Sequence, residues 1–212
     1  MNTRLSVSVG LICLPLSVLA EGTVVSARLG SLGLSVEGGF GLTEQFSTRL
    51  GINRYQYDTT ERVDGNKYDL DLDWQSISLF ADWHPFDVPL RFTAGFLRNS
   101  NEIQGETNAS SITIGDTLYR DVGLKADIDF RTFAPYLGLG WESGLFRERG
   151  WGFNVDLGVM YQGTGRVNLI ATGMGADLVD PNDLAREEER FEEDLEDYRY
   201  YPVFSFGVSY KF

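Results

Sequence analysis

Residues 200–212 read YYPVFSFGVSYKF. The stretch separates into two faces, one apolar (Phe204, Phe206, Val208, Tyr210, Phe212) and one mostly small or polar (Val203, Ser205, Gly207, Ser209, Lys211). Alternation with a period of two predicts a β-strand with one apolar side. A soluble sandwich could bury such a face in its core, but the aromatic residues at both ends of the stretch are typical of a strand that crosses a membrane.

The same ending resembles the C-terminal signal of bacterial outer-membrane barrels, an apolar alternation that closes on Phe. Tyr210 and Phe212 are the residues that carry this resemblance. It implies that the barrel-assembly machinery is a partner of the chain and that the last strand ends on the periplasmic side.

The N-terminus predicts secretion. Residues 1–20 read MNTRLSVSVGLICLPLSVLA, with a positive Arg4, an apolar stretch at 5–14, and small residues at Val18 and Ala20 before the expected cleavage point. This pattern indicates a signal peptide, because the apolar stretch is too short for a hydrocarbon core of ~30 Å. We therefore expect a signal peptide at 1–20 and an outer-membrane barrel at 21–212.

Composition excludes several classes of protein. The chain has one Cys, one His and a formal net charge of -13. A disulfide framework, a His-paired metal site and nucleic-acid binding through the overall charge are therefore not expected. Lipid A-modifying barrels use a His near the outer leaflet, whereas His84 precedes Pro85 in a short connection expected in the periplasm. We predict neither an enzyme nor a cofactor.

The alternation recurs along the chain. It is regular at 32–42, 46–55, 90–99 and 151–163, and it slips phase once within 68–83 and once within 122–142. A slip indicates a β-bulge or a change of environment where the strand leaves the membrane.

Strand parity sets the number of strands. The long polar connections lie at 58–67, 103–121 and 172–199, and the short ones at 42–45, 84–89 and 143–150. In bacterial barrels the short turns lie in the periplasm and the number of strands is even. The alternation gives seven strands, so an eighth is required, and we place it at 23–29. The prediction is an all-β fold, an eight-stranded antiparallel transmembrane up-and-down β-barrel in the cell outer membrane.

Alternation also places charged side chains inside the barrel. The candidates for lining the lumen are Glu37, Arg49, Arg91, Asp127, Asp129, Arg131, Glu142, Asp156 and Lys211. Eight strands leave an interior that side chains nearly fill. These charges either pair into a plug or line a narrow route for a small cationic or zwitterionic solute.

The segment 180–198 reads DPNDLAREEERFEEDLEDY. Asp180 suits an N-cap and Pro181 the first helical position, so we expect a short acidic extracellular helix. Its candidate acidic residues are Asp183, Glu187, Glu188, Glu192, Glu193 and Asp194. They form either a solvated lid or a surface that attracts cations or binds divalent ions that bridge lipopolysaccharide.

With the strands placed, the chain resembles the small outer-membrane barrels grouped with CarO, the carbapenem-associated ornithine-uptake porin. The resemblance is carried by DGNKYDLDLD at 64–73, APYLGLGW at 134–141, WGFNVDLGVMYQGTGRVNL at 151–169 and the acidic segment before the last strand. It implies an eight-stranded barrel and uptake of ornithine or other basic amino acids.

Two functions follow as hypotheses. The first is porin-like passive uptake of small solutes with a preference for basic amino acids such as ornithine. The alternative is a closed structural or interaction barrel whose acidic loop binds lipopolysaccharide, divalent cations or a partner.

Overall fold

The computed structural model describes residues 22–63, 66–86, 88–99, 102–143 and 149–212, and the side chains of 57–74 and 108–110 are not among those described. The predicted signal peptide at 1–20 lies outside these residues. Within them, no helix combines the length and the apolar character needed to cross a membrane.

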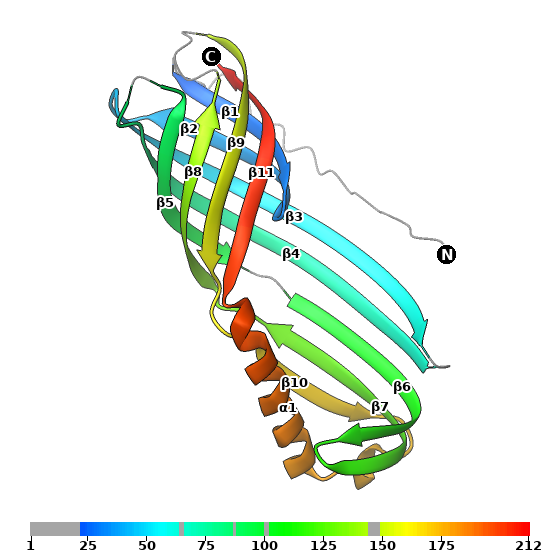
Figure 1. The fold of residues 1–212 in the computed structure, drawn as a ribbon. Coiled ribbons are helices and arrows are strands. Elements are labelled where there is room, and N and C mark those ends of the chain that lie inside the picture. Colours follow the sequence, from blue (N-terminus) through cyan, green and yellow to red (C-terminus); the bar gives the residue numbers. More distant parts are fainter. Residues whose placement is uncertain (1–21, 64–65, 87, 100–101, 144–148) are drawn as a thin grey trace.

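Eight antiparallel strands close into a barrel (Figure 1). In chain order they are β1 (Thr23–Gly30), β2 (Gly33–Gly41), β3 (Phe46–Val63), β4 (Asn66–Trp83), β5 (Leu90–Asn99), β8 (Phe133–Glu142), β9 (Gly150–Tyr161) and β11 (Tyr200–Lys211). The pairing of β1 with β11 and of β4 with β5 closes the cylinder. The predicted fold class is confirmed, and the strand that parity required at 23–29 is β1.

The two ends of the barrel differ. The turn end holds Gly22, Phe212 and the connections that precede β3, β5 and β9. At the opposite end, which we call the sheet end, the chain leaves the barrel to build a second structure. The short connections that the sequence predicted before β3, β5 and β9 all lie at the turn end.

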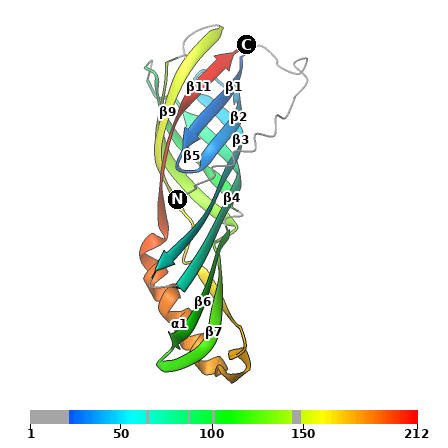
Figure 2. The same ribbon diagram turned by 90° about the vertical axis from the view of Figure 1, so that its right-hand side faces the viewer.

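This second structure is a sheet that continues the barrel wall (Figure 2). The first half of β4 pairs with β6 (Glu102–Ile114), which pairs with β7 (Thr117–Asp129), which pairs with β10 (Arg166–Thr172). The sequence prediction of long loops at 58–67 and 103–121 was wrong, because β3 and β4 occupy most of the first range, and β6 and the start of β7 occupy most of the second. Polar sequences form strands here because the first half of β4 has an edge that β5 does not pair with, and β6 forms its backbone hydrogen bonds there.

Both phase slips mark the junction of barrel and sheet. In β4 the slip falls between Asp73, which pairs with Glu102 of β6, and Ser76, which pairs with Asn99 of β5. The stretch 122–142 is two strands, because β7 ends at Asp129 and β8 begins at Phe133. The slip there is a change of strand rather than a bulge.

Helix α1 (Pro181–Leu195) covers one face of this sheet (Figure 1). Asp180 caps it by accepting a hydrogen bond from the Asn182 backbone N–H at 2.8 Å, as predicted. Leu184 and Leu195 pack against a buried apolar cluster of the sheet and its flanking turn, made of Ile114, Val122, Leu124, Val167, Leu169 and Val179.

The outer wall of the barrel is apolar. Large side chains there are 43–69% exposed, among them Val36, Leu50, Ile52, Leu79, Phe96, Leu137, Phe153, Leu157, Phe204 and Phe206. Aromatic pairs flank this belt, with Trp83–Phe92 and Trp151–Tyr210 towards the turn end and Tyr161–Tyr200 towards the sheet end. So much apolar surface in contact with the surroundings requires an apolar medium around it.

Candidate functional site

A layer of charged side chains crosses the interior of the barrel. Each strand except β11 contributes one charged residue, giving three arginines and four carboxylates: Arg28, Glu37, Arg49, Asp82, Arg91, Glu142 and Asp156. All seven are 1–8% exposed. We call this set the ionic layer.

The arginines of the ionic layer bridge carboxylates from different strands. Arg49 lies 2.8 Å from Glu37 and 3.0 Å from Asp82. Arg28 contacts Glu37 at 3.1 Å and also bonds to Asp156.

Arg91 completes the network. It lies 2.8 Å from both Glu142 and Asp156 and 3.5 Å from Asp82. Hydroxyl groups donate further hydrogen bonds to the carboxylates: Thr93 donates to Asp82 at 2.6 Å, and Ser209 of β11 donates to Glu142 at 2.9 Å. All eight strands therefore contribute a polar group, and the layer ties the wall together across its full circumference.

Glycines on the inner wall make room for the charged side chains of the ionic layer. A Cβ on Gly140 would lie 2.6 Å from both Arg91 Nε and Asp156 Oδ1. A Cβ on Gly51 would lie 2.8 Å from Glu37 Cγ. These positions need glycine because long charged side chains pass directly over the backbone.

An apolar layer lies between the ionic layer and the sheet end. Its buried residues are Phe80, Leu97, Ala134, Tyr136, Met160 and Val203. Arg49 stacks over the Phe80 ring at 5.2 Å, and the Phe80 and Tyr136 rings lie 4.8 Å apart. The interior is thus filled by two layers of different chemistry.

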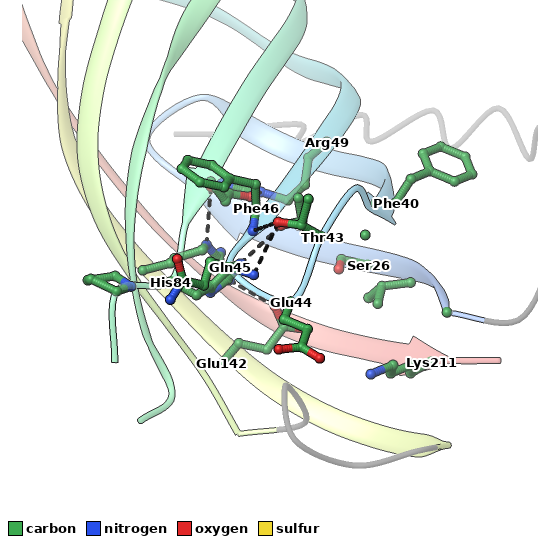
Figure 3. Close-up of a pocket in the computed structure, with 18 of the residues that line it drawn as sticks. Ser26, Phe40, Thr43, Glu44, Gln45, Phe46, Arg49, His84, Glu142 and Lys211 are labelled. Carbon is green, nitrogen blue, oxygen red and sulfur yellow. Dashed lines mark hydrogen bonds and ion pairs between the residues drawn. The ribbon is translucent and has the colours of Figure 1, made fainter. Parts of the chain in front are cut away.

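The turn end, in contrast, contains a cavity of about 320 Å³ (Figure 3). Its charged lining comprises Glu44, Arg49, Asp82, Arg91, Glu142 and Lys211, and His84 also lines it. On the other side of the ionic layer only about 20 Å³ is open, beside Arg28, Phe80 and Tyr136. The cavity therefore opens at the turn end and ends at the ionic layer.

Most predicted interior residues lie where alternation placed them. Glu37, Arg49, Arg91, Glu142 and Asp156 belong to the ionic layer, and Lys211 lines the cavity. The prediction was wrong for three others. Asp127 and Asp129 lie on β7, which pairs only with β6 and β10, and Arg131 follows β7 and is exposed.

Sequence reasoning missed two members of the ionic layer. Arg28 lies on β1, which has too few residues for a clear pattern. Asp82 shares an inward face with Ser76 and Ser78 on β4. The alternation of the second half of β4, read separately from the first half, would have placed Asp82 in the interior.

Most of the predicted acidic residues of α1 accept hydrogen bonds from the sheet that the helix covers. Glu188 and Glu192 accept hydrogen bonds from the backbone N–H groups of Leu169 and Val167, at 2.7 and 3.1 Å. Those groups lie on β10, the edge strand of the sheet, so two carboxylates one helical turn apart cap an otherwise open edge.

Two further carboxylates of α1 face the sheet. Glu187 accepts from the Gly115 backbone N–H at 2.9 Å, and Asp183, 4% exposed, accepts from the Tyr119 hydroxyl at 2.6 Å. The Tyr119 hydrogen bond, chief among several, holds the pKa of Asp183 below its usual range. Only Glu193 and Asp194 of the predicted set are exposed.

Among the described residues, no group of three or more His, Cys, Asp or Glu side chains is arranged to hold a metal ion.

Comparison with known proteins supports the fold. No family model and no curated protein matches the chain. Solved structures do match, and two of them are of Acinetobacter baumannii proteins. CarO aligns with a TM-score of 0.60 at 21% identity over 92% of this chain and 98% of its own. CarO2 aligns with a TM-score of 0.61 at 21% identity over 90% of this chain and 98% of its own. The chain has the CarO-like barrel fold that its sequence suggested.

Proposed function

We propose that this protein is an outer-membrane β-barrel with a closed lumen that acts as a structural or interaction protein through its outer sheet and acidic helix. The ionic layer carries the proposal, because its seven buried side chains fill the cross-section and satisfy one another. The apolar outer wall with aromatic residues at both ends supports the membrane location. The turn end then faces the periplasm and α1 the exterior.

Refolding the protein into lipid vesicles tests whether the lumen is closed. We expect a heat-modifiable folded barrel on gels and no swelling of vesicles in ornithine, lysine, glutamate or a neutral sugar. Swelling with any of them would contradict a closed lumen.

The exposed carboxylates Glu193 and Asp194 are the candidates for contact with divalent ions and lipopolysaccharide. Neutralising both to Gln and Asn should weaken Ca²⁺-dependent binding of the protein to lipopolysaccharide vesicles. The matched control removes the same charge from exposed positions outside α1, Asp129→Asn with Asp177→Asn. Equal loss in both double variants would show that only overall charge matters. Deleting 180–198 is a poorer test, because it uncovers the edge of β10.

A second candidate is porin-like uptake of basic amino acids such as ornithine. It is supported by the excess of one carboxylate in the ionic layer, which favours cations. Passage of a solute through the barrel requires the ionic layer to rearrange. Faster swelling in ornithine and lysine than in glutamate, reversed or abolished by Asp156→Arg, would establish this function in place of the closed barrel.

A further inference from the structure

Three exposed arginines lie at the sheet end of the outer barrel wall, where the apolar surface stops. Arg54 follows Ile52 on the outward face of β3, and Arg98 follows Phe96 on the outward face of β5. Arg131 lies in the connection just before β8. We call these three residues the arginine rim.

The strand register places the arginine rim along one continuous part of the wall. Arg54 and Arg98 both pair with residues of β4, one on each side of that strand. The axes of β3 and β5 are therefore about 10 Å apart, twice the usual spacing of neighbouring strands. The guanidinium carbon of Arg131 lies 6.0 Å from the ring centre of Tyr161 on β9. The arginine rim thus extends from β3 through β4, β5 and β8 to the edge of β9.

These guanidinium groups are available to a ligand. Among the side chains that the structure describes, none of the three arginines has a carboxylate as an ion-pair partner, whereas Arg28, Arg49 and Arg91 of the ionic layer each have several. An exposed arginine therefore offers its planar set of donors to an anion at the surface of the barrel.

The opposite part of the same rim has a different character. Tyr161 and Tyr200 form an aromatic pair on β9 and β11 there, and Arg199 beside them is paired with Glu196 at 4.0 Å. The acidic helix α1 joins the wall at β11 (Figure 1). Unpaired positive charge at the sheet end of the wall is thus concentrated, among the described side chains, from β3 to the edge of β9.

The wall next to the arginine rim is apolar. Ile52, Phe96 and Phe133 are 43%, 58% and 65% exposed on the same outward faces. In the membrane placement proposed above, these side chains contact acyl chains and the arginines lie at the level of the outer headgroups. Guanidinium groups bind phosphate through two parallel hydrogen bonds. A ligand that fits both surfaces carries acyl chains and phosphate groups.

We infer that the arginine rim binds the phosphate groups of a phosphorylated lipid of the outer leaflet, whose acyl chains pack against β3, β4, β5 and β8. The inference rests on the proposed membrane placement and adds a second lipid contact to the one proposed for Glu193 and Asp194. The two contacts differ in chemistry. Carboxylates need a divalent cation to bridge them to phosphate, whereas the arginines bind phosphate directly and without a metal.

Lipid binding in micelles of an uncharged detergent, with EDTA present, tests this contact. The probes are lipid A with two phosphates, the same lipid with both phosphates removed, and inorganic phosphate, and native mass spectrometry counts the bound molecules for each folded barrel. We expect saturable binding of lipid A, about tenfold weaker binding of the dephosphorylated lipid, and no binding of inorganic phosphate at the same concentrations. Equal affinity for the two lipids, binding of lipid A only when Ca²⁺ is added, or equal affinity for inorganic phosphate would each overturn the inference.

A matched pair of double variants locates the contact. Arg54→Gln with Arg98→Gln removes two charges of the arginine rim, and Arg120→Gln with Arg166→Gln removes two charges from exposed positions of β7 and β10, outside the barrel wall. An exposed ion pair contributes up to roughly fivefold in Kd, so the rim variant should bind lipid A about tenfold more weakly. The control should bind it as the unmodified protein does. Equal loss in both would show that overall charge attracts the lipid and would contradict the site.

Arg54→Lys with Arg98→Lys covers the case in which the glutamine variant does not fold. It keeps both charges and should retain most of the affinity for lipid A, so a loss of about tenfold in this folded variant would also contradict the site. Insertion of the unmodified protein into lipid vesicles separates the two levels of the argument. If the protein does not insert, the proposed membrane function fails. If it inserts but does not distinguish the two lipids, only the present inference fails.

Discussion

Arg91→Met should destabilise the barrel strongly. The substitution keeps an unbranched, flexible side chain but removes contacts of 2.8 Å to Glu142 and to Asp156. It leaves two arginines against four buried carboxylates in the ionic layer. Removing one partner of a buried ion pair typically costs about 3–5 kcal/mol, because the remaining charge is left without compensation. We expect the free energy of unfolding to fall by that amount.

The assay is equilibrium unfolding in denaturant of protein refolded into lipid vesicles, followed by tryptophan fluorescence. The control is Lys125→Met, which breaks a 3.5 Å pair with Asp127 that is partly exposed outside the barrel. Such a pair contributes at most about 1 kcal/mol. Adding Glu142→Gln to Arg91→Met removes one uncompensated charge and should recover part of the loss. Equal effects of Arg91→Met and Lys125→Met, or no recovery in the double variant, would refute the role of the ionic layer.

Three further predictions follow from particular contacts. Gly140→Ala should cost about 1–3 kcal/mol by overpacking against Arg91, whereas Gly105→Ala, with nothing near its Cβ, should be neutral or slightly stabilising in the same unfolding assay. Because the folded-state pKa of Asp183 is lowered, its contribution to docking of α1 is present above the usual Asp pKa and is lost as pH falls through the lowered value. Amide hydrogen exchange of α1 should accelerate as the pH falls through that value. Asp183→Asn should reduce this pH dependence, and the same pH profile in both proteins would argue against a role of Asp183 in docking. Burial lowers the pKa of His84, in the turn after β4, below its ordinary 6.5. Its NMR titration midpoint should therefore fall below 6.5, and stability should decrease as pH falls through that range, since the unfolded chain takes up the proton first.

Local pattern determined the barrel strands and their faces. The alternation at 200–212 and 151–163 depends only on the two-residue period of a strand, so it predicts which side chains point inwards without knowledge of any partner. For the same reason Glu37, Arg49 and Asp156 were placed in the interior from sequence alone.

The sheet beyond the barrel could not be predicted in this way. Its strand β6 is polar and lacks a clear alternation, and it forms because the first half of β4 offers a free edge. Asp127 and Asp129 then lie outside the barrel although their alternation matches that of inward residues. Pairing with a distant strand, rather than the local pattern, decides on which side of the wall a residue lies.

The sequence by itself determined the barrel, its apolar outer wall and its charged interior, because the properties of a strand face are local. Only the tertiary structure decided that three arginines satisfy four carboxylates across the barrel and that two glutamates of α1 cap the edge of β10. These features depend on distances between residues that are far apart in the chain, and those distances are set by how the sheet closes.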